Sequence, residues 1–329
     1  MRLLTQMKNS KIFTLTSSDT SSYRSYLGSY NNDSFYYLYA VNDAVDTANL
    51  TIDLSKWMIN ADTKIIAESV SNGIWGEVSV LTAPLSGAKL NLILNPYSTT
   101  RLAIQTGVQS NKTINSALSC SAQAGAKSNI IGCSNSSLYV GTSNTVQHEN
   151  TYISLIKFDL ASLVKKNQRV ILKLNIEAVL GTSNVTALVL GIRNQTTTWD
   201  QNSASWSYLS STSGLNILNA LPSGNVIANV SQNFINWSSS SNLCIVGHIT
   251  GVKGQLNQAK MIDVTEYLTN LFNSGSSTAT FVLYRPFRHP AYKTSSGGIP
   301  ADNLSSGSTI KFSSHLSSNK PQLIQYSTV

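Results

Sequence analysis

The stretch FVLYRPFRHPAYK, residues 281–293, concentrates cationic and aromatic side chains of the kind that recognise anions. Its candidate ligand-binding residues are Tyr284, Arg285, Arg288, His289 and Lys293. Arginine forks bind carboxylate and sulfate groups through two hydrogen bonds at once. The residue types therefore predict a site for an anionic ligand. An edge strand protected by its charges is the alternative interpretation, and the sequence leaves both open.

Catalysis would need further chemistry in the same region. Glycoside hydrolysis uses two carboxylates on either side of a sugar ring, and only seven acidic residues follow residue 110. Asp159 and Asp263 lie in contexts typical of turns and helix caps. A lyase would need a base and a cation. Tyr284, Arg288 and His289 could supply both, but the sequence gives no geometry for them. We expect no catalytic residue, no enzyme activity and no cofactor; no sequence pattern indicates a metal site.

The net charge of +8 is confined to one part of the chain. Up to residue 110 there are eight basic and eight acidic residues, whereas fifteen basic and seven acidic residues follow. A basic surface favours an acidic partner, and an acidic polysaccharide is the one we expect. The chain carries no nucleic-acid-binding motif, so we expect no nucleic acid partner. No apolar stretch is long enough to span a membrane, so membrane insertion is not expected.

The surface composition, low in charge and rich in Ser and Thr, is usual for secreted all-β proteins, and the sequons permit glycosylation without arguing for it. Cys120 and Cys133 are close enough in sequence to predict a local disulfide, and Cys244 is expected to be a buried free thiol, with three reduced cysteines as the alternative. The N-terminus has no signal-peptide core, so any signal is expected upstream. Roughly eight glycosylation sequons would occur by chance in this composition. The candidates are Asn32, Asn49, Asn111, Asn135, Asn184, Asn194, Asn229, Asn236 and Asn303.

Short apolar runs separated by turn-forming residues predict an all-β protein of two tandem antiparallel β-sandwiches. The first domain, residues 1–108, has predicted strands at 11–16, 35–41, 50–54, 63–70, 76–81, 89–94 and 99–104. The stretch 106–117 is polar and lacks strand periodicity, so it is expected to mark the boundary.

The second domain, residues 109–329, is predicted to be a jelly roll with one short helix at 264–274. Its predicted strands lie at 137–141, 151–160, 169–180, 184–192, 224–230, 243–249, 278–284, 308–314 and 321–327.

Several motifs occur in a recognisable order between residues 120 and 326. They are LYVG (138–141), LIKFDL (155–160), RVILKLNI (169–176), TTWDQNSASW (197–206), MIDVTEYLTNLFNSG (261–275), GGIPADNLSSGSTIKFSS (297–314) and PQLIQY (321–326). This order resembles the DNRLRE-domain family, also classified as carbohydrate-binding module family 96. The resemblance implies a secreted jelly roll that binds polysaccharide, with alginate-like acidic polymers as ligands. It also implies that Trp199 and Trp206 anchor a long loop. The segment HLSS (315–318) departs from the family, which commonly has a glutamate near this point.

The first domain resembles the all-β accessory domain that follows the barrel of agarase-like polysaccharide hydrolases. The resemblance rests on FYYLYAVND, ANLTIDLSKW, IIAESV and PYSTTRLAI. The main functional prediction is a non-catalytic, secreted protein that binds acidic polysaccharide. One alternative is a structural subunit of an extracellular fibre or coat that self-assembles by strand addition, using a segment such as KIFTLTSS. Another is the C-terminal fragment of a polysaccharide-degrading enzyme.

Overall fold

A computed structural model shows two compact units in the chain. Unit 1 comprises Met1–Lys112, Leu163–Val170 and Ile324–Val329, and unit 2 comprises Thr113–Ser162 and Ile171–Leu323. The expected domain boundary at residue 108 stays a prediction. The structure describes residues 11–13, 23–30, 35–55, 57, 59, 62–71, 77–82, 89–107, 109–123, 129–142, 151–165, 168–181, 184–193, 199–210, 243–285 and 308–328.

The prediction of an all-β protein is confirmed. The described residues form antiparallel sheets and two short helices, α2 (Trp206–Ser210) and α5 (Thr265–Asn273). The sequence predicted α5 within one residue at each end but did not predict α2. Among the described helices, none combines the length and the hydropathy that a membrane crossing requires.

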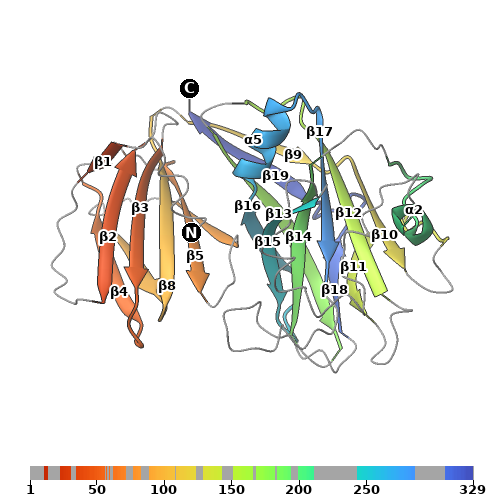
Figure 1. The fold of residues 1–329 in the computed structure, drawn as a ribbon, viewed down its shortest axis with the longest axis horizontal. Helices are drawn as coiled ribbons and strands as arrows, with labels where there is room; N and C mark the ends of the chain where they lie inside the picture. Colours follow the sequence, from red (N-terminus) through yellow and green to blue (C-terminus); the bar gives the residue numbers. More distant parts are fainter. Residues whose placement is uncertain are drawn as a thin grey trace. The chain divides into compact units, whose positions relative to one another are not determined.

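Unit 1 contains a six-stranded sheet and a two-stranded ribbon (Figure 1). The order in the sheet is β1 (Lys11–Phe13), β2 (Arg24–Tyr30), β3 (Phe35–Asn42), β8 (Ser98–Gln105), β5 (Lys64–Ser71) and β6 (Val78–Thr82). The ribbon pairs β4 (Ala48–Asp53) with β7 (Lys89–Leu94). Leu38, Leu102 and Ile104 of the sheet share a buried cluster with Ile52 and Leu94 of the ribbon. Alternating apolar residues therefore hold the two layers together.

The other face of this sheet buries an ion pair. Glu68 and Arg101 are direct partners on β5 and β8, and the Arg101 Nη2 to Glu68 Oε2 distance is 2.7 Å. Their side chains are only 0% and 2% exposed. On the same face, the Tyr37 hydroxyl of β3 accepts a hydrogen bond from the guanidinium of Arg169, which lies outside this sheet. These polar groups show that both faces of the sheet are covered, at least around β3, β5 and β8.

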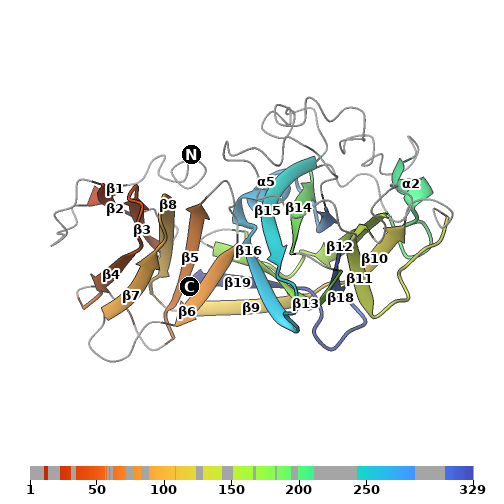
Figure 2. The same ribbon diagram turned by 90° about the horizontal axis from the view of Figure 1, so that it is seen from below.

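Most strands of unit 2 belong to one long curled sheet, which also contains residues assigned to unit 1 in β9, β13 and β19. Its order is β15 (Leu243–Gly251), β14 (Val185–Ile192), β17 (Thr278–Tyr284), β12 (Thr151–Asp159), β11 (Ser137–Thr142), β18 (Thr309–Ser313), β13 (Gln168–Leu180), β19 (Gln322–Thr328) and β9 (Gln109–Asn115). Off this path, β10 (Leu118–Gln123) pairs with β12 and β16 (Gln258–Asp263) pairs with β13. The curl brings β14 and β17 against β11 and β18, so one sheet forms both layers of a sandwich (Figure 2).

Aromatic contacts fill part of the space inside unit 2. The Phe281 ring of β17 lies edge-on to Phe158 of β12 and to Tyr267 of α5, with centroid distances of 5.9 and 5.2 Å. The Tyr267 hydroxyl lies 2.8 Å from the carbonyl oxygen of Ile192 and 3.0 Å from that of Thr280, so its single proton is shared between them and holds α5 against β14 and β17. A Cβ atom at Gly191 would lie 2.5 Å from the Tyr267 ring, so only glycine allows this approach.

The structure corrects the prediction for residues 106–117. Residues Gln109–Asn115 form β9, a strand at the end of the sheet order. Most of its side chains are exposed on both faces, so its sequence lacks the apolar alternation by which strands are recognised. Strands β2, β10 and β16 were likewise not predicted. The predicted strand at 224–230 lies outside the described residues.

The ion pair in unit 1 provides a stability test. Replacing Glu68 by Gln removes the buried charge paired with the Arg101 guanidinium, so the free energy of unfolding of unit 1 should fall by about 3–5 kcal/mol. Urea unfolding followed by hydrogen exchange of β5 and β8 measures this change. The apolar double variant Glu68→Leu with Arg101→Met should recover most of the loss. An unchanged free energy in Glu68→Gln would show that the ion pair contributes nothing.

Candidate functional site

One surface of unit 2 combines polar, charged and aromatic side chains. On β11, β18 and β13 the buried residues Leu138, Phe312 and Ile176 point into the sandwich. The neighbours of these residues along each strand point to the opposite face of the sheet. On that face the register places Tyr139 directly opposite Lys311. We call this surface the polar face, and define it as Ser137, Tyr139, Tyr152, Asn175, Glu177, Lys311 and Ser313.

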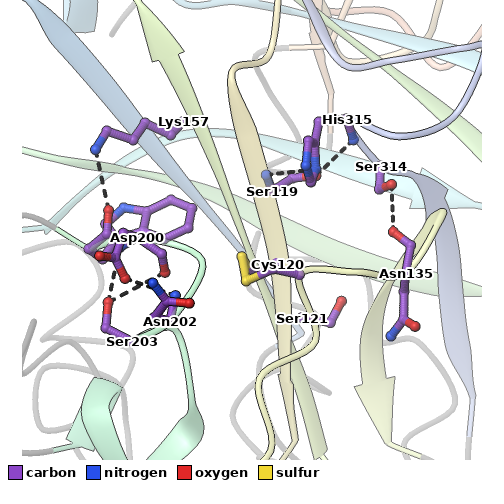
Figure 3. Close-up of a disulfide and its surroundings, with 12 residues drawn as sticks. Ser119, Cys120, Ser121, Asn135, Lys157, Asp200, Asn202, Ser203, Ser314 and His315 are labelled. Atoms are coloured by element: carbon purple, nitrogen blue, oxygen red, sulfur yellow. Dashed lines mark hydrogen bonds between the residues drawn. A yellow bond between two sulfur atoms is a disulfide. The ribbon is translucent and has the colours of Figure 1, made fainter.

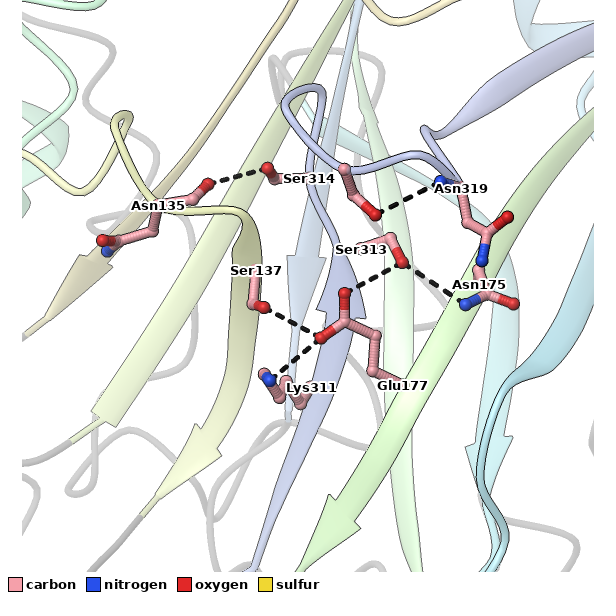
Figure 4. A network of polar contacts seen from close by, with 9 residues as sticks. Asn135, Ser137, Asn175, Glu177, Lys311, Ser313, Ser314 and Asn319 are labelled. Atoms are coloured by element: carbon pink, nitrogen blue, oxygen red, sulfur yellow. Dashed lines mark hydrogen bonds and ion pairs between the residues drawn. The ribbon is translucent and has the colours of Figure 1, made fainter.

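Glu177 occupies an irregular position in β13. Ile176 pairs with Phe312, but the next paired residue is Ala178 with Lys311, so Glu177 is the extra residue of a β-bulge. Its Oε2 atom accepts hydrogen bonds from Lys311 Nζ at 3.0 Å and Ser137 Oγ at 2.8 Å. Its Oε1 atom accepts one from Ser313 Oγ at 3.0 Å (Figure 4). Three donors from two strands, β11 and β18, therefore fix the carboxylate.

The lysine of this pair is accessible to solvent. The side chains of Lys311 and Glu177 are 33% and 22% exposed. The hydrogen bond to Glu177 raises the pKa of Lys311, with burial acting in the opposite direction. Asn175 donates from its amide to Ser313 Oγ at 3.3 Å, which extends the network along β13. The result is a half-exposed cation held beside a compensating carboxylate.

Two tyrosines lie next to the charged pair. The ring centroids of Tyr139 and Tyr152 are 5.7 Å apart, with planes inclined by 44°. Burial and the neighbouring Tyr139 raise the pKa of Tyr152. The backbone of Tyr139 is held by two serines: its N–H donates to Ser121 Oγ at 2.9 Å, and its carbonyl accepts from Ser154 Oγ at 2.8 Å. Tyr139 is thus a fixed aromatic residue beside Lys311.

The structure places only part of the basic segment 281–293. Tyr284 and Arg285 are 2% and 4% exposed. The Arg285 guanidinium donates to the carbonyl of Ser308 at 2.8 Å, which ties the end of β17 to the start of β18. Arg288, His289 and Lys293 lie outside the described residues. A ligand-binding role for these five residues stays a prediction, and burial gives Tyr284 and Arg285 a clear role in packing.

The segment 199–210 covers one face of the strands β10, β12, β17, β14 and β15. Trp199 is buried, and its indole N–H donates to Thr280 Oγ1 at 3.2 Å. Lys157 Nζ donates to the Trp199 carbonyl at 3.3 Å (Figure 3). Asp200 accepts a hydrogen bond from the N–H of Asn202, which lowers the pKa of its carboxyl. This contact network agrees with the predicted anchoring role of Trp199, and Trp206 packs against the same core cluster.

The predicted disulfide between Cys120 and Cys133 is confirmed. Cys244 is a free thiol, and burial raises its pKa. Next to the disulfide, the N–H of Ser119 donates to Nδ1 of His315 at 3.1 Å, and the N–H of His315 donates to Ser119 Oγ at 2.9 Å (Figure 3). These reciprocal bonds fasten β10 to the turn that follows β18.

Four of the candidate glycosylation sites can be examined. Asn49, Asn111, Asn135 and Asn184 are exposed, and glycosylation at each stays a prediction. The other five, Asn32, Asn194, Asn229, Asn236 and Asn303, lie outside the described residues. Within the part of the chain that the structure describes, no three His, Cys, Asp or Glu side chains are grouped as metal ligands would be.

Comparison with known proteins yields distant structural similarity alone. No protein-family model and no curated protein sequence matches the chain. A solved structure of BuGH86 in complex with neoagarooctaose has 7% identity and a TM-score of 0.25, covering 93% of this chain and 34% of its own. A β-porphyranase of glycoside hydrolase family 86 from Bacteroides plebeius has 9% identity and a TM-score of 0.23, with coverages of 97% and 38%. The chain thus spans just over a third of the length of these two proteins.

A third solved structure is the CBM22-1–CBM22-2 tandem domain from Paenibacillus barcinonensis Xyn10C. It has 10% identity and a TM-score of 0.26, and the match covers 94% of this chain and 92% of that one. Similarity of this size does not establish a shared function. The resemblance to the DNRLRE-domain family stays a prediction.

His315 should make the stability of unit 2 depend on pH. Burial, together with the nearby Lys320, lowers the pKa of its imidazole below the ordinary value of 6.5. Between these two values the unfolded chain binds more protons, so stability is complete above about pH 6.5 and falls as the pH drops toward the folded pKa. Urea unfolding of unit 2 between about pH 7.5 and pH 5 measures this loss.

The matched variant is His315→Asn, whose amide oxygen can accept the Ser119 N–H but does not titrate. The wild type should lose more stability on acidification than this variant. Equal pH dependence in the two proteins would assign the effect to other groups.

Proposed function

We propose that unit 2 is a non-catalytic module that binds polysaccharide, and that the polymer lies on the polar face. The observation that carries this proposal is the placement of the Tyr139–Tyr152 pair directly beside the Lys311–Glu177 pair. Ligand sites combine aromatic surface with a few fixed polar groups. Here the tyrosine rings offer surface to the C–H face of a sugar, and the charged pair offers hydrogen bonds to its substituents.

The positions of the sequence motifs support the same proposal. LYVG lies on β11, LIKFDL on β12, RVILKLNI on β13 and STIKFSS on β18. Strands β12, β11, β18 and β13 are consecutive in the sheet and carry the whole polar face. The motifs that resemble a carbohydrate-binding family therefore build the surface to which we assign binding.

The carboxylates of unit 2 support a non-catalytic role. Asp159 and Asp263 accept hydrogen bonds from the backbone N–H groups of Ala161 and Thr265, as the sequence context suggested. Glu177 is engaged by Lys311 and two serines. Paired catalytic carboxylates would have to face one another across a sugar ring. These three side chains instead have structural partners, so we propose that this chain does not cleave its ligand.

Secretion and a preference for acidic polymers are finer parts of the proposal. The disulfide is of a kind that persists in oxidising compartments, which supports an extracellular location. The basic surplus after residue 110 supports an acidic polymer. Among the cationic residues behind that preference we include Arg288, His289 and Lys293.

Affinity electrophoresis and calorimetric titration with alginate, polygalacturonate and a neutral glucan test the proposal. The wild type should bind at least one polymer and release no reducing ends or unsaturated products. Tyr139→Ala and Tyr152→Ala should each lower the affinity about two- to tenfold, as the loss of one aromatic contact implies. The matched control is Tyr23→Ala in unit 1, an exposed tyrosine outside the polar face. Wild-type affinity in both polar-face variants would overturn the assignment of the surface.

A further inference from the structure

The polar face contains a cation whose charge is already compensated. Lys311 Nζ lies 3.0 Å from Glu177 Oε2, and both side chains are partly exposed. An anionic oxygen bound to Lys311 at a usual distance of about 2.8 Å would lie at most about 6 Å from the Glu177 carboxylate. Repulsion by Glu177 would then offset much of the attraction by Lys311. This part of the polar face therefore offers an anion little net electrostatic gain.

Glu177 cannot easily turn away to leave Lys311 free. Ser137 donates to its Oε2 atom and Ser313 to its Oε1 atom, so both oxygens are held independently of the lysine. The β-bulge also aims the Glu177 side chain at β18, where Lys311 and Ser313 lie. The compensation is thus built into the backbone of β13 and into two neighbouring strands.

The hydrogen-bonding capacity of the pair suits a hydroxyl group. An ammonium group has three donors, and Lys311 directs one of them to Glu177. A carboxylate has about four acceptor sites, of which Glu177 uses three for Lys311, Ser137 and Ser313. A sugar diol can accept from Lys311 and donate to Glu177 at once. A ligand carboxylate or sulfate accepts only, so it cannot use the remaining capacity of Glu177.

The register brings this pair to the edge of the aromatic surface. Tyr139 and Lys311 are direct cross-strand partners, and such side chains start about 5 Å apart. A sugar ring stacked on Tyr139 therefore has its equatorial substituents within reach of Lys311 and Glu177. We infer that Tyr139, Lys311 and Glu177 form a subsite for an uncharged sugar residue, recognised through its hydroxyl groups. This inference rests on the proposed polysaccharide-binding function. It implies that any preference for acidic polymers arises outside this subsite.

Two polymers that share a backbone and differ in the charge of their carboxyl groups test the inference: polygalacturonate and its methyl ester. The wild type should bind the ester at the polar face with little change between about 0.02 M and 0.3 M salt. Glu177→Gln removes the compensating charge with minimal change of shape. It should raise the affinity for polygalacturonate roughly two- to fivefold at low salt, as expected for a partly exposed charge. It should weaken binding of the ester, because a carboxylate acceptor is lost.

The matched control is Glu266→Gln, which changes the net charge equally at an exposed position on α5. An equal rise in polygalacturonate affinity in both variants would overturn the inference, since the effect would then be a general one of net charge. The double variant Glu177→Gln with Lys311→Met provides a second readout, because it removes both charges of the pair and leaves the net charge unchanged. It should lower the affinity for the ester without selectively lowering that for polygalacturonate.

The outcomes separate this inference from the proposed function. If the wild type binds polygalacturonate alone, and the double variant Glu177→Gln with Lys311→Met abolishes that binding, the module binds polysaccharide but the subsite is an anion site, so the inference fails. If the wild type binds none of the polymers in either series, the proposed function fails and the inference with it. Near-ultraviolet circular dichroism of each variant confirms that losses of binding do not reflect unfolding.

Discussion

The central strands of unit 2 must be covered on both faces. This requirement determines where the other elements of that unit lie. Every residue of β14 is buried, as are nearly all those of β17. A sheet curled on itself can cover only its inner face. The outer face of these strands is covered by the segment 199–210, in which Trp199 packs against apolar residues of β10, β12, β14 and β17. Burial on both faces produces continuous apolar runs in the sequence instead of alternation.

This requirement also explains where binding chemistry is available. Residues 172–177 of β13 alternate between buried and partly exposed, and β11 and β18 leave Tyr139 and Lys311 partly exposed next to the buried Ser137 and Ser313. Their outer face can therefore carry Tyr139, Lys311 and Glu177 at little cost to the core. The serines around Glu177 show that this surface is organised by hydrogen bonds between strands. A surface organised in this way keeps its shape before a ligand arrives, which reduces the entropy lost on binding.

The sequence predicted the covered strands well and the binding surface poorly, for related reasons. Apolar runs such as TATFVLY (278–284) contain the burial signal in adjacent residues, so their strands were placed within one or two positions. Strand β9 has no buried face and gives no such signal. Tyr139 and Lys311 are far apart in sequence, and only the β11–β18 register makes them neighbours. The bulge that directs Glu177 toward Lys311 depends on a pairing irregularity that residue types alone do not reveal. The basic segment 281–293 was predicted to bind an anion because its charges are adjacent in sequence, yet Arg285 is buried.

The contact between Gly191 and Tyr267 has an evolutionary consequence. The Tyr267 ring occupies the volume that a side chain at position 191 would need, and its hydroxyl bridges the carbonyls of Ile192 and Thr280. The two positions therefore form one steric unit, although one lies on a strand and the other on a helix. Related sequences should change them together: a larger residue at 191 would require a smaller one at 267, with a new partner for both carbonyls. Covariation at this pair would identify distant relatives even where strand sequences have diverged beyond recognition.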